Sequence, residues 1–285
     1  PAIIVSGGPM QPGRLPTGET IDVAGLGELG ARYARGEITQ AQLAEFVECV
    51  APGCGACSGL FTANSMNCMA EALGLALPWN GTIPAVFGRR RELAKMAGMR
   101  VMELWEKQVT PRQILTKEAF ANAITVDMAI GGSSNTLLHL MALAHEAGVP
   151  LDLALFDAIS RRTPRLCDLS PAGRHYVEDL YYAGGIQAVM KELTKRDLLH
   201  CEAMTVSGKT VEEITAEAEV RRRDVIRNID EPYDGEGGLA VLYGNLAPEG
   251  AVVKKAAVRR EMWTHAGPAR VFDIEEEAVE AIRGG

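Results

Sequence analysis

A loop with two cysteines that leads directly into a helical segment constrains the fold of this chain more than any other feature. The loop reads Cys54-Gly-Ala-Cys57-Ser-Gly, and residues 62–77 follow it. Five apolar residues of that segment recur on one helical face: Met66, Met69, Ala70, Leu73 and Leu77. Thr62 or Asn64 is available to cap the helix. The spacing therefore predicts that the cysteine loop lies at a helix N-terminus.

Apolar runs and end signals give the remaining elements. Further helices are predicted at residues 39–50, 88–107, 117–123, 134–147, 152–162, 184–193 and 275–282. Strands are predicted at residues 2–5, 238–243 and 251–253. We expect an α/β fold with a sheet flanked by helices to about Arg221, followed by the start of a β-rich, barrel-like unit. The predicted domains are residues 1–221, incomplete at the N-terminus, and residues 222–285, also incomplete.

Composition narrows the class of protein and its partners. With 285 residues, of which 47% are hydrophobic and 23% charged, the chain can bury a sizeable core. A count of 29 Lys and Arg against 37 Asp and Glu gives a net charge of −8, so we expect no nucleic acid partner. No apolar stretch approaches the roughly 20 residues of a membrane span, which predicts a soluble protein with no membrane partner. Pro1 opens a predicted strand rather than a signal peptide, and we interpret it as a cut end.

The six cysteines suit thiol or metal chemistry in a reducing compartment better than a disulfide scaffold. A helix N-terminus stabilises a thiolate, the form that binds metal, so either Cys54 or Cys57 could be a ligand. A structural zinc site would need a second close pair of cysteines or histidines, and no other cysteines have that spacing. From spacing alone, a redox pair and two small buried apolar side chains remain as alternatives.

A longer stretch resembles a known enzyme family. The signature of the dihydroxy-acid and 6-phosphogluconate dehydratases is similar to the run Pro52-Gly-Cys-Gly-Ala-Cys-Ser-Gly-Leu-Phe-Thr-Ala-Asn-Ser-Met-Asn-Cys-Met-Ala-Glu-Ala-Leu-Gly-Leu-Ala-Leu-Pro78. Further segments resemble the family in the same order, at residues 4–10, 127–139, 238–254 and 265–272. The resemblance covers all 285 residues.

This resemblance implies a dehydratase, a hydro-lyase that converts 2,3-dihydroxy carboxylic acids to 2-oxo acids in valine and isoleucine biosynthesis. It implies an iron–sulfur cluster (2Fe–2S or 4Fe–4S) and Mg²⁺ as the two Lewis acids of the reaction. Cys57 corresponds to one cluster ligand, and we interpret Cys54 and the other four cysteines as packing or structural residues. The resemblance further implies a cytoplasmic homodimer that acts on a small-molecule dihydroxy acid.

The resemblance is to an internal piece of the family enzyme. The family's other two cluster cysteines, together with an Asp and a carbamylated Lys that bind magnesium, precede the position that matches Pro1. A magnesium-binding glutamate and a serine base lie beyond the position that matches Gly285. One cluster ligand of three cannot hold a cluster, so we expect the chain alone to be inactive. Two alternatives stay open: a sugar-acid dehydratase of the same family, and an inactive module for folding or dimerisation.

Two further positions bear on function. The backbone N–H groups of Gly131-Gly-Ser-Ser-Asn-Thr136 could receive a carboxylate, which makes Ser133 and Ser134 candidate substrate-binding residues. Simple helix capping by either serine is the interpretation that physical grounds favour. Trp79 stands where the resemblance predicts Gly, and a positive φ at that position would strain a tryptophan.

Overall fold

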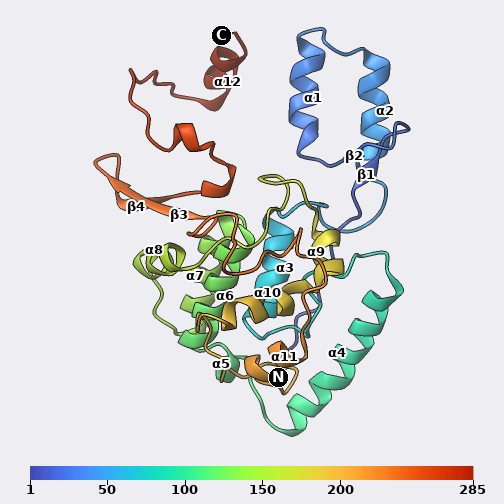
Figure 1. Cartoon of the computed structure of the whole chain (residues 1–285), viewed down its shortest axis with the longest axis vertical. Coiled ribbons are helices and arrows are strands. Elements are labelled where there is room, and N and C mark those ends of the chain that lie inside the picture. The colour runs from blue at the N-terminus through green and yellow to red at the C-terminus, as the bar shows by residue number, and fades with distance from the viewer. Residues whose placement is uncertain (285) are drawn as a thin grey trace.

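Helix α3 lies at the centre of the main body of the computed structural model, which describes residues 1–284, and α6, α7 and α10 pack around it (Figure 1). The helices are α1 (Gly25–Ala34), α2 (Gln40–Val50), α3 (Thr62–Ala72), α4 (Gly88–Glu106), α5 (Pro111–Ile114), α6 (Lys117–Ile130), α7 (Asn135–Ala147), α8 (Leu153–Arg162), α9 (Val177–Ala183), α10 (Gly185–Thr194), α11 (Val211–Glu217) and α12 (Glu275–Gly284). The strands form two antiparallel pairs, β1 (Gly13–Arg14) with β2 (Thr20–Ile21) and β3 (Ala240–Gly244) with β4 (Ala247–Val253). The expected α/β class is confirmed, in a helix-rich form with small sheets.

Helix α6 is the most completely buried element of the main body. Every residue from Ala119 to Ile130 is buried. The sequence predicted this helix only to residue 123 because a helix that is buried all round lacks the periodic stripe of an amphipathic one. Gly131, with φ of 68°, adopts the left-handed conformation that ends it.

Helix α3 is shorter than its apolar pattern predicts. It ends at Ala72 rather than at residue 77, because Gly74 adopts a φ of 78° and turns the chain. The N–H groups of Leu75 and Ala76 then both donate to the carbonyl of Ala70 at 3.0 Å. The chain from this turn leads through Trp79 to α4.

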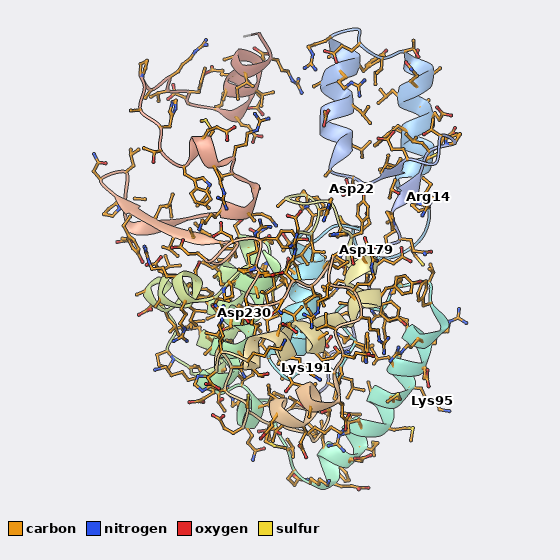
Figure 2. All side chains as sticks on the ribbon, viewed as in Figure 1. Arg14, Asp22, Lys95, Asp179, Lys191 and Asp230 are labelled. Carbon is orange, nitrogen blue, oxygen red and sulfur yellow. The ribbon has the colours of Figure 1, made fainter. Side chains whose placement is uncertain are left out.

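Helices α1 and α2 form a hairpin that projects from the main body (Figure 1). Their small core is formed by three buried side chains, Ile21, Phe46 and Val50. The hydroxyl of Thr39 caps α2 by accepting from the N–H of Gln42. Where the hairpin joins the body, the carboxylate of Asp22, labelled in Figure 2, accepts a hydrogen bond from the hydroxyl of Ser170.

The predicted strands have mixed outcomes. The two near the C-terminus are confirmed as β3 and β4, and in residues 1–284 they form a two-stranded sheet with no barrel. The strand predicted at residues 2–5 is wrong, because this run meets the turn after α3: the N–H of Ile4 donates to the carbonyl of Leu75 at 2.9 Å. Over the described part of the chain, no helix has both the length and the apolar character needed to cross a membrane.

Candidate functional site

The loop that carries Cys57 is held on both sides by backbone contacts. The N–H of Ala56 donates to the carbonyl of Gly8 at 2.9 Å, and the N–H of Met10 donates to the carbonyl of Ala56 at 2.7 Å. A Cβ at Gly55, where φ is 129°, would lie 2.6 Å from the backbone nitrogen of Met10, so this close approach requires glycine. The backbone that immediately precedes Cys57 is therefore held in place.

Asn64, in the first turn of α3, fixes the other side of the loop. Its buried side-chain amide donates to the carbonyls of Cys57 and Gly59, the latter at 2.9 Å. The Cys57 side chain is half-buried, whereas Cys54 is exposed. The backbone of Cys57 is thus anchored at the start of α3, and its thiol retains partial exposure.

The expected capping of α3 by Thr62 or Asn64 is wrong. The N-cap residue is Phe61, and it makes no side-chain capping bond. The side chain of Asn64 instead binds the preceding Cys57 loop, and that of Thr62 binds a loop more than 70 residues further along the chain. The hydroxyl of Thr62 lies 3.1 Å from that of Ser133 and accepts from the side-chain amide of Asn135 at 2.8 Å.

The loop at residues 131–135 lies against the first turns of α3. Besides the Thr62 contacts, the N–H of Ser133 donates to the hydroxyl of Ser65 at 3.1 Å. The structure thus brings the helix that follows Cys57 together with Ser133, a pairing of segments 68 residues apart. Ser134 is exposed, and within residues 1–284 its hydroxyl has no hydrogen-bond partner.

Most N–H groups of this loop already have partners. Gly132 donates to the carbonyl of Asp127, and Asn135 donates to the hydroxyl of Ser133 at 3.2 Å. The N-cap residue of α7 is Ser134, and it makes no side-chain capping bond, so the simple capping favoured from the sequence is wrong; Ser133 instead accepts from the N–H two residues further on. A role for Ser133 and Ser134 in binding substrate stays a prediction.

Asp127 lies beneath this loop and is completely buried. One carboxylate oxygen accepts from the hydroxyl of Thr136, and the other, Oδ1, has no partner within residues 1–284. Burial raises the pKa of Asp127 to about 7, against the lowering effect of the Thr136 hydrogen bond and of the nearby Lys254. A Cβ on Gly132 would lie only 1.8 Å from Oδ1, so the loop can cover this carboxylate only with glycine.

Lys254, which directly follows β4, closes the loop from the other side. Its ammonium donates to the carbonyls of Gly131 and Gly132 at 2.9 and 3.0 Å. Burial lowers the pKa of Lys254 to about 8, an effect opposed by the negative charge of Asp127. Sequence reasoning missed this residue. Its only signal is a lysine at the end of an apolar strand, because the carbonyls that it binds lie more than a hundred positions earlier.

The other cysteines differ from Cys57 in their surroundings. Cys68 and Cys167 are completely buried, which raises the pKa of Cys167 to about 12 and that of Cys68 well above its ordinary value. Cys49 and Cys201 are half-buried. All six thiols are free. The buried pair fits the structural role expected from the sequence.

A complete metal site is not found among the described residues. Within residues 1–284, no three His, Cys, Asp or Glu side chains are grouped so that they could hold a metal ion. The residues present therefore do not fit an iron–sulfur cluster or a magnesium ion as a whole. Cys57 fits as a single thiolate donor, because it is anchored and accessible.

Comparison with known proteins covers the whole chain. The N-terminal model of the dihydroxy-acid/6-phosphogluconate dehydratases matches residues 1–214, and the C-terminal model matches residues 224–285. Two curated relatives are dihydroxy-acid dehydratases from Caldanaerobacter subterraneus, 57% identical over 285 residues, and Caldicellulosiruptor bescii, 56% identical over 286 residues. A third, from Solidesulfovibrio magneticus, is 57% identical over 287 residues. Each alignment covers 100% of this chain and 51% of the relative, so the chain spans about half the length of the curated relatives it matches.

Proposed function

Because the chain belongs to the dihydroxy-acid/6-phosphogluconate dehydratase family, we propose that it is part of a hydro-lyase that converts a 2,3-dihydroxy carboxylic acid to a 2-oxo acid and water. The substrates are those of branched-chain amino-acid biosynthesis. The relatives are named dihydroxy-acid dehydratase, and the likeness extends over every segment of the chain. The observation that carries the proposal is the anchored Cys57 loop at the start of α3.

Cys57 supplies one ligand of an iron–sulfur cluster in the whole protein. The remaining cluster ligands and the magnesium ligands come from outside this chain. The cluster and Mg²⁺ supply Lewis-acid chemistry when they are bound. The contribution of this chain is positional: Asn64 holds the carbonyl beside the Cys57 thiol, and Thr62 and Ser65 tie α3 to the loop at residues 131–135.

Lys254 connects the two parts of the family match. It lies within the C-terminal match and binds carbonyls of Gly131 and Gly132 in the N-terminal match. Two charge-assisted bonds from one ammonium keep the loop beside α3. We assign to Lys254 the role of a positioning residue that sets the distance of Ser133 and Ser134 from Cys57.

An activity assay of the whole protein containing this chain tests the proposal. The substrates are 2,3-dihydroxy-isovalerate and a set of sugar acids that includes 6-phosphogluconate. We expect turnover of the dihydroxy acid, and a loss of about 100-fold or more in Cys57→Ser but little change in the matched control Cys54→Ser. Turnover of sugar acids alone would overturn the substrate class, and an unchanged Cys57→Ser variant would overturn the site.

The family likeness extends the proposal to assembly and location. We infer a cytoplasmic homodimer, a setting in which six free thiols stay reduced. Analytical ultracentrifugation of the whole protein tests the assembly. A monomer at micromolar concentration contradicts it.

A further inference from the structure

A cavity of about 570 Å³ lies at the opposite end of α3 from Cys57. Its walls come from α4 on one side, from α10 and α11 on the other, and from the turn at residues 77–79. Its volume is in the range of small-molecule sites. The Cys57 loop and residues 131–135 do not line it. An α-helix rises 1.5 Å per residue, so the 11 residues of α3 separate the two places by roughly 16 Å.

A strained aromatic residue forms part of the wall. Trp79 has a φ of 78°, in the left-handed region, as the glycine expected at this position suggested. Glu71 holds this turn, because its carboxylate oxygens accept from the N–H groups of Trp79 and Gly81, each at 2.9 Å. Strain of this kind persists only where the surroundings enforce it, and it concentrates at ligand sites.

A buried amide lines the same cavity without a partner. Gln187 is only 4% exposed, and within residues 1–284 neither its Nε2 nor its Oε1 has a hydrogen-bond partner. Thr82 Oγ1 is likewise buried without a partner. The Trp79 ring lies close to this amide, since a Cβ added to Gly185 would meet both Gln187 Oε1 at 3.0 Å and Trp79 Cε3 at 3.1 Å. Buried polar groups are normally satisfied, so the Gln187 amide is suited to bind a polar group of a ligand in the cavity.

Among the charged side chains that line the cavity, one cation forms no ion pair with any described residue. Three of its four cationic side chains pair with carboxylates that also line it: Arg100 with Glu103, Lys209 with Glu217, and Arg221 with Glu219. Within residues 1–284, the fourth, Arg89, forms no ion pair and lies over the Trp79 ring at 4.6 Å from its centroid. The cavity is therefore suited to a ligand that carries one negative charge.

The rest of the wall is apolar. Besides the Trp79 ring it includes the side chains of Leu93, Met96 and Met99 on α4. Aromatic rings and thioethers both favour contact with a flat π-system. The Trp79 ring lies near both polar side chains, since Arg89 lies over it and Gln187 Oε1 is close to its Cε3 atom.

We propose that this cavity binds a small monocarboxylate with a flat apolar body, whose carboxylate pairs with Arg89 and whose hydroxyl or amide at the far end meets Gln187. The Trp79 ring packs against the body of the ligand. This site is separate from the Cys57 site and does not depend on the dehydratase reaction.

Titration calorimetry on the 285-residue chain tests the proposal with 4-hydroxyphenylacetate as the probe. We expect saturable binding, weakened about 10-fold for the uncharged 4-hydroxyphenylacetamide and about 5-fold for phenylacetate, which lacks the hydroxyl. Arg89→Gln should weaken binding of the probe about 10-fold. The matched control is Arg91→Gln, an exposed arginine of α4 outside the cavity, and it should leave binding within about 2-fold.

Gln187→Leu separates the role of the amide from general packing. It should weaken 4-hydroxyphenylacetate but leave phenylacetate unchanged. Three results would overturn the proposal: no saturable binding, equal affinity for the acid and its amide, or equal losses in Arg89→Gln and Arg91→Gln. The comparison of the three probes needs no variant, so it decides the matter even if Gln187→Leu does not fold.

Discussion

The two ends of α3 are built in opposite ways. At the N-terminal end, the side chains of Thr62, Asn64 and Ser65 all bind neighbouring loops, and Lys254 closes the arrangement. At the C-terminal end, Trp79 is strained and the amide of Gln187 has no partner within residues 1–284. The first end suits precise positioning of a thiol. The second retains unused binding capacity beside a cavity.

The difference also shows in how each end uses a buried carboxylate. Asp127 receives one hydroxyl and is covered by a glycine loop. Glu71 receives two backbone N–H groups and holds the strained turn, and burial raises its pKa to about 7 as well. Glu71 therefore holds the backbone directly, whereas the Asp127 carboxylate, among the described residues, binds only a side chain beneath the loop, and substitutions at both ends can test this comparison.

Gly132→Ala should give the largest effect, at the N-terminal end. The new Cβ would overlap Oδ1 of a completely buried Asp127, so we expect a loss of about 3 kcal/mol in the free energy of unfolding. The control is Gly98→Ala on α4, where no atom lies within 4 Å of the new Cβ, and it should stabilise by roughly 0.5–1 kcal/mol. Urea denaturation measures both. Equal stabilities of Gly132→Ala and the unmodified chain would show that the loop is not tightly packed.

The pH dependence of stability should follow Asp127. Its pKa rises from 3.8 in the unfolded chain to about 7 in the folded one, so between these values the folded state binds more protons. The unfolding free energy therefore falls as pH rises from about 4 to 7, by about 3 kcal/mol from this group. Asp127→Asn should remove that part of the slope in denaturation curves at pH 4.5 to 7.5. An unchanged slope would mean that Asp127 stays ionised throughout.

Lys254→Met keeps most of the side-chain length but removes the donor for two carbonyls. We expect a loss of about 1.5 kcal/mol in the free energy of unfolding and faster amide exchange at residues 131–135. Lys95→Met is the control, on an exposed position of α4 (Figure 2), and it should change stability by less than about 0.5 kcal/mol. If amide exchange at the loop is the same in both variants, Lys254 does not hold it.

Substitutions of Trp79 should give the smallest change in stability, and the test is whether the glycine or the alanine variant is the more stable. At a positive φ, Trp79→Gly should be more stable than Trp79→Ala by about 1 kcal/mol. Trp105, within α4, provides the opposite case, since there alanine should exceed glycine by roughly 0.5–1 kcal/mol. Thermal unfolding of the four variants measures both differences. The same order at both positions would exclude backbone strain at Trp79.

Sequence reasoning succeeded where a signal was local. Helix spacing placed Cys57 at the start of α3, and the glycine expected at position 79 pointed to the positive φ that the structure has. It failed for Thr62 and Asn64, because their side chains could equally cap the helix or bind a loop, which is the adjacent Cys57 loop for Asn64 and a distant one for Thr62. The contact of Lys254 with Gly131 could not be predicted, because nothing in the sequence around either residue specifies a partner 123 residues away.

The most direct test of the central claim is the iron and acid-labile sulfide content of the whole protein carrying Cys57→Ser or Cys54→Ser. The account predicts that Cys57→Ser loses most of its iron and sulfide, because the anchored thiolate at the start of α3 is a cluster ligand. Cys54→Ser should keep both. Full iron and sulfide content in Cys57→Ser would contradict the account.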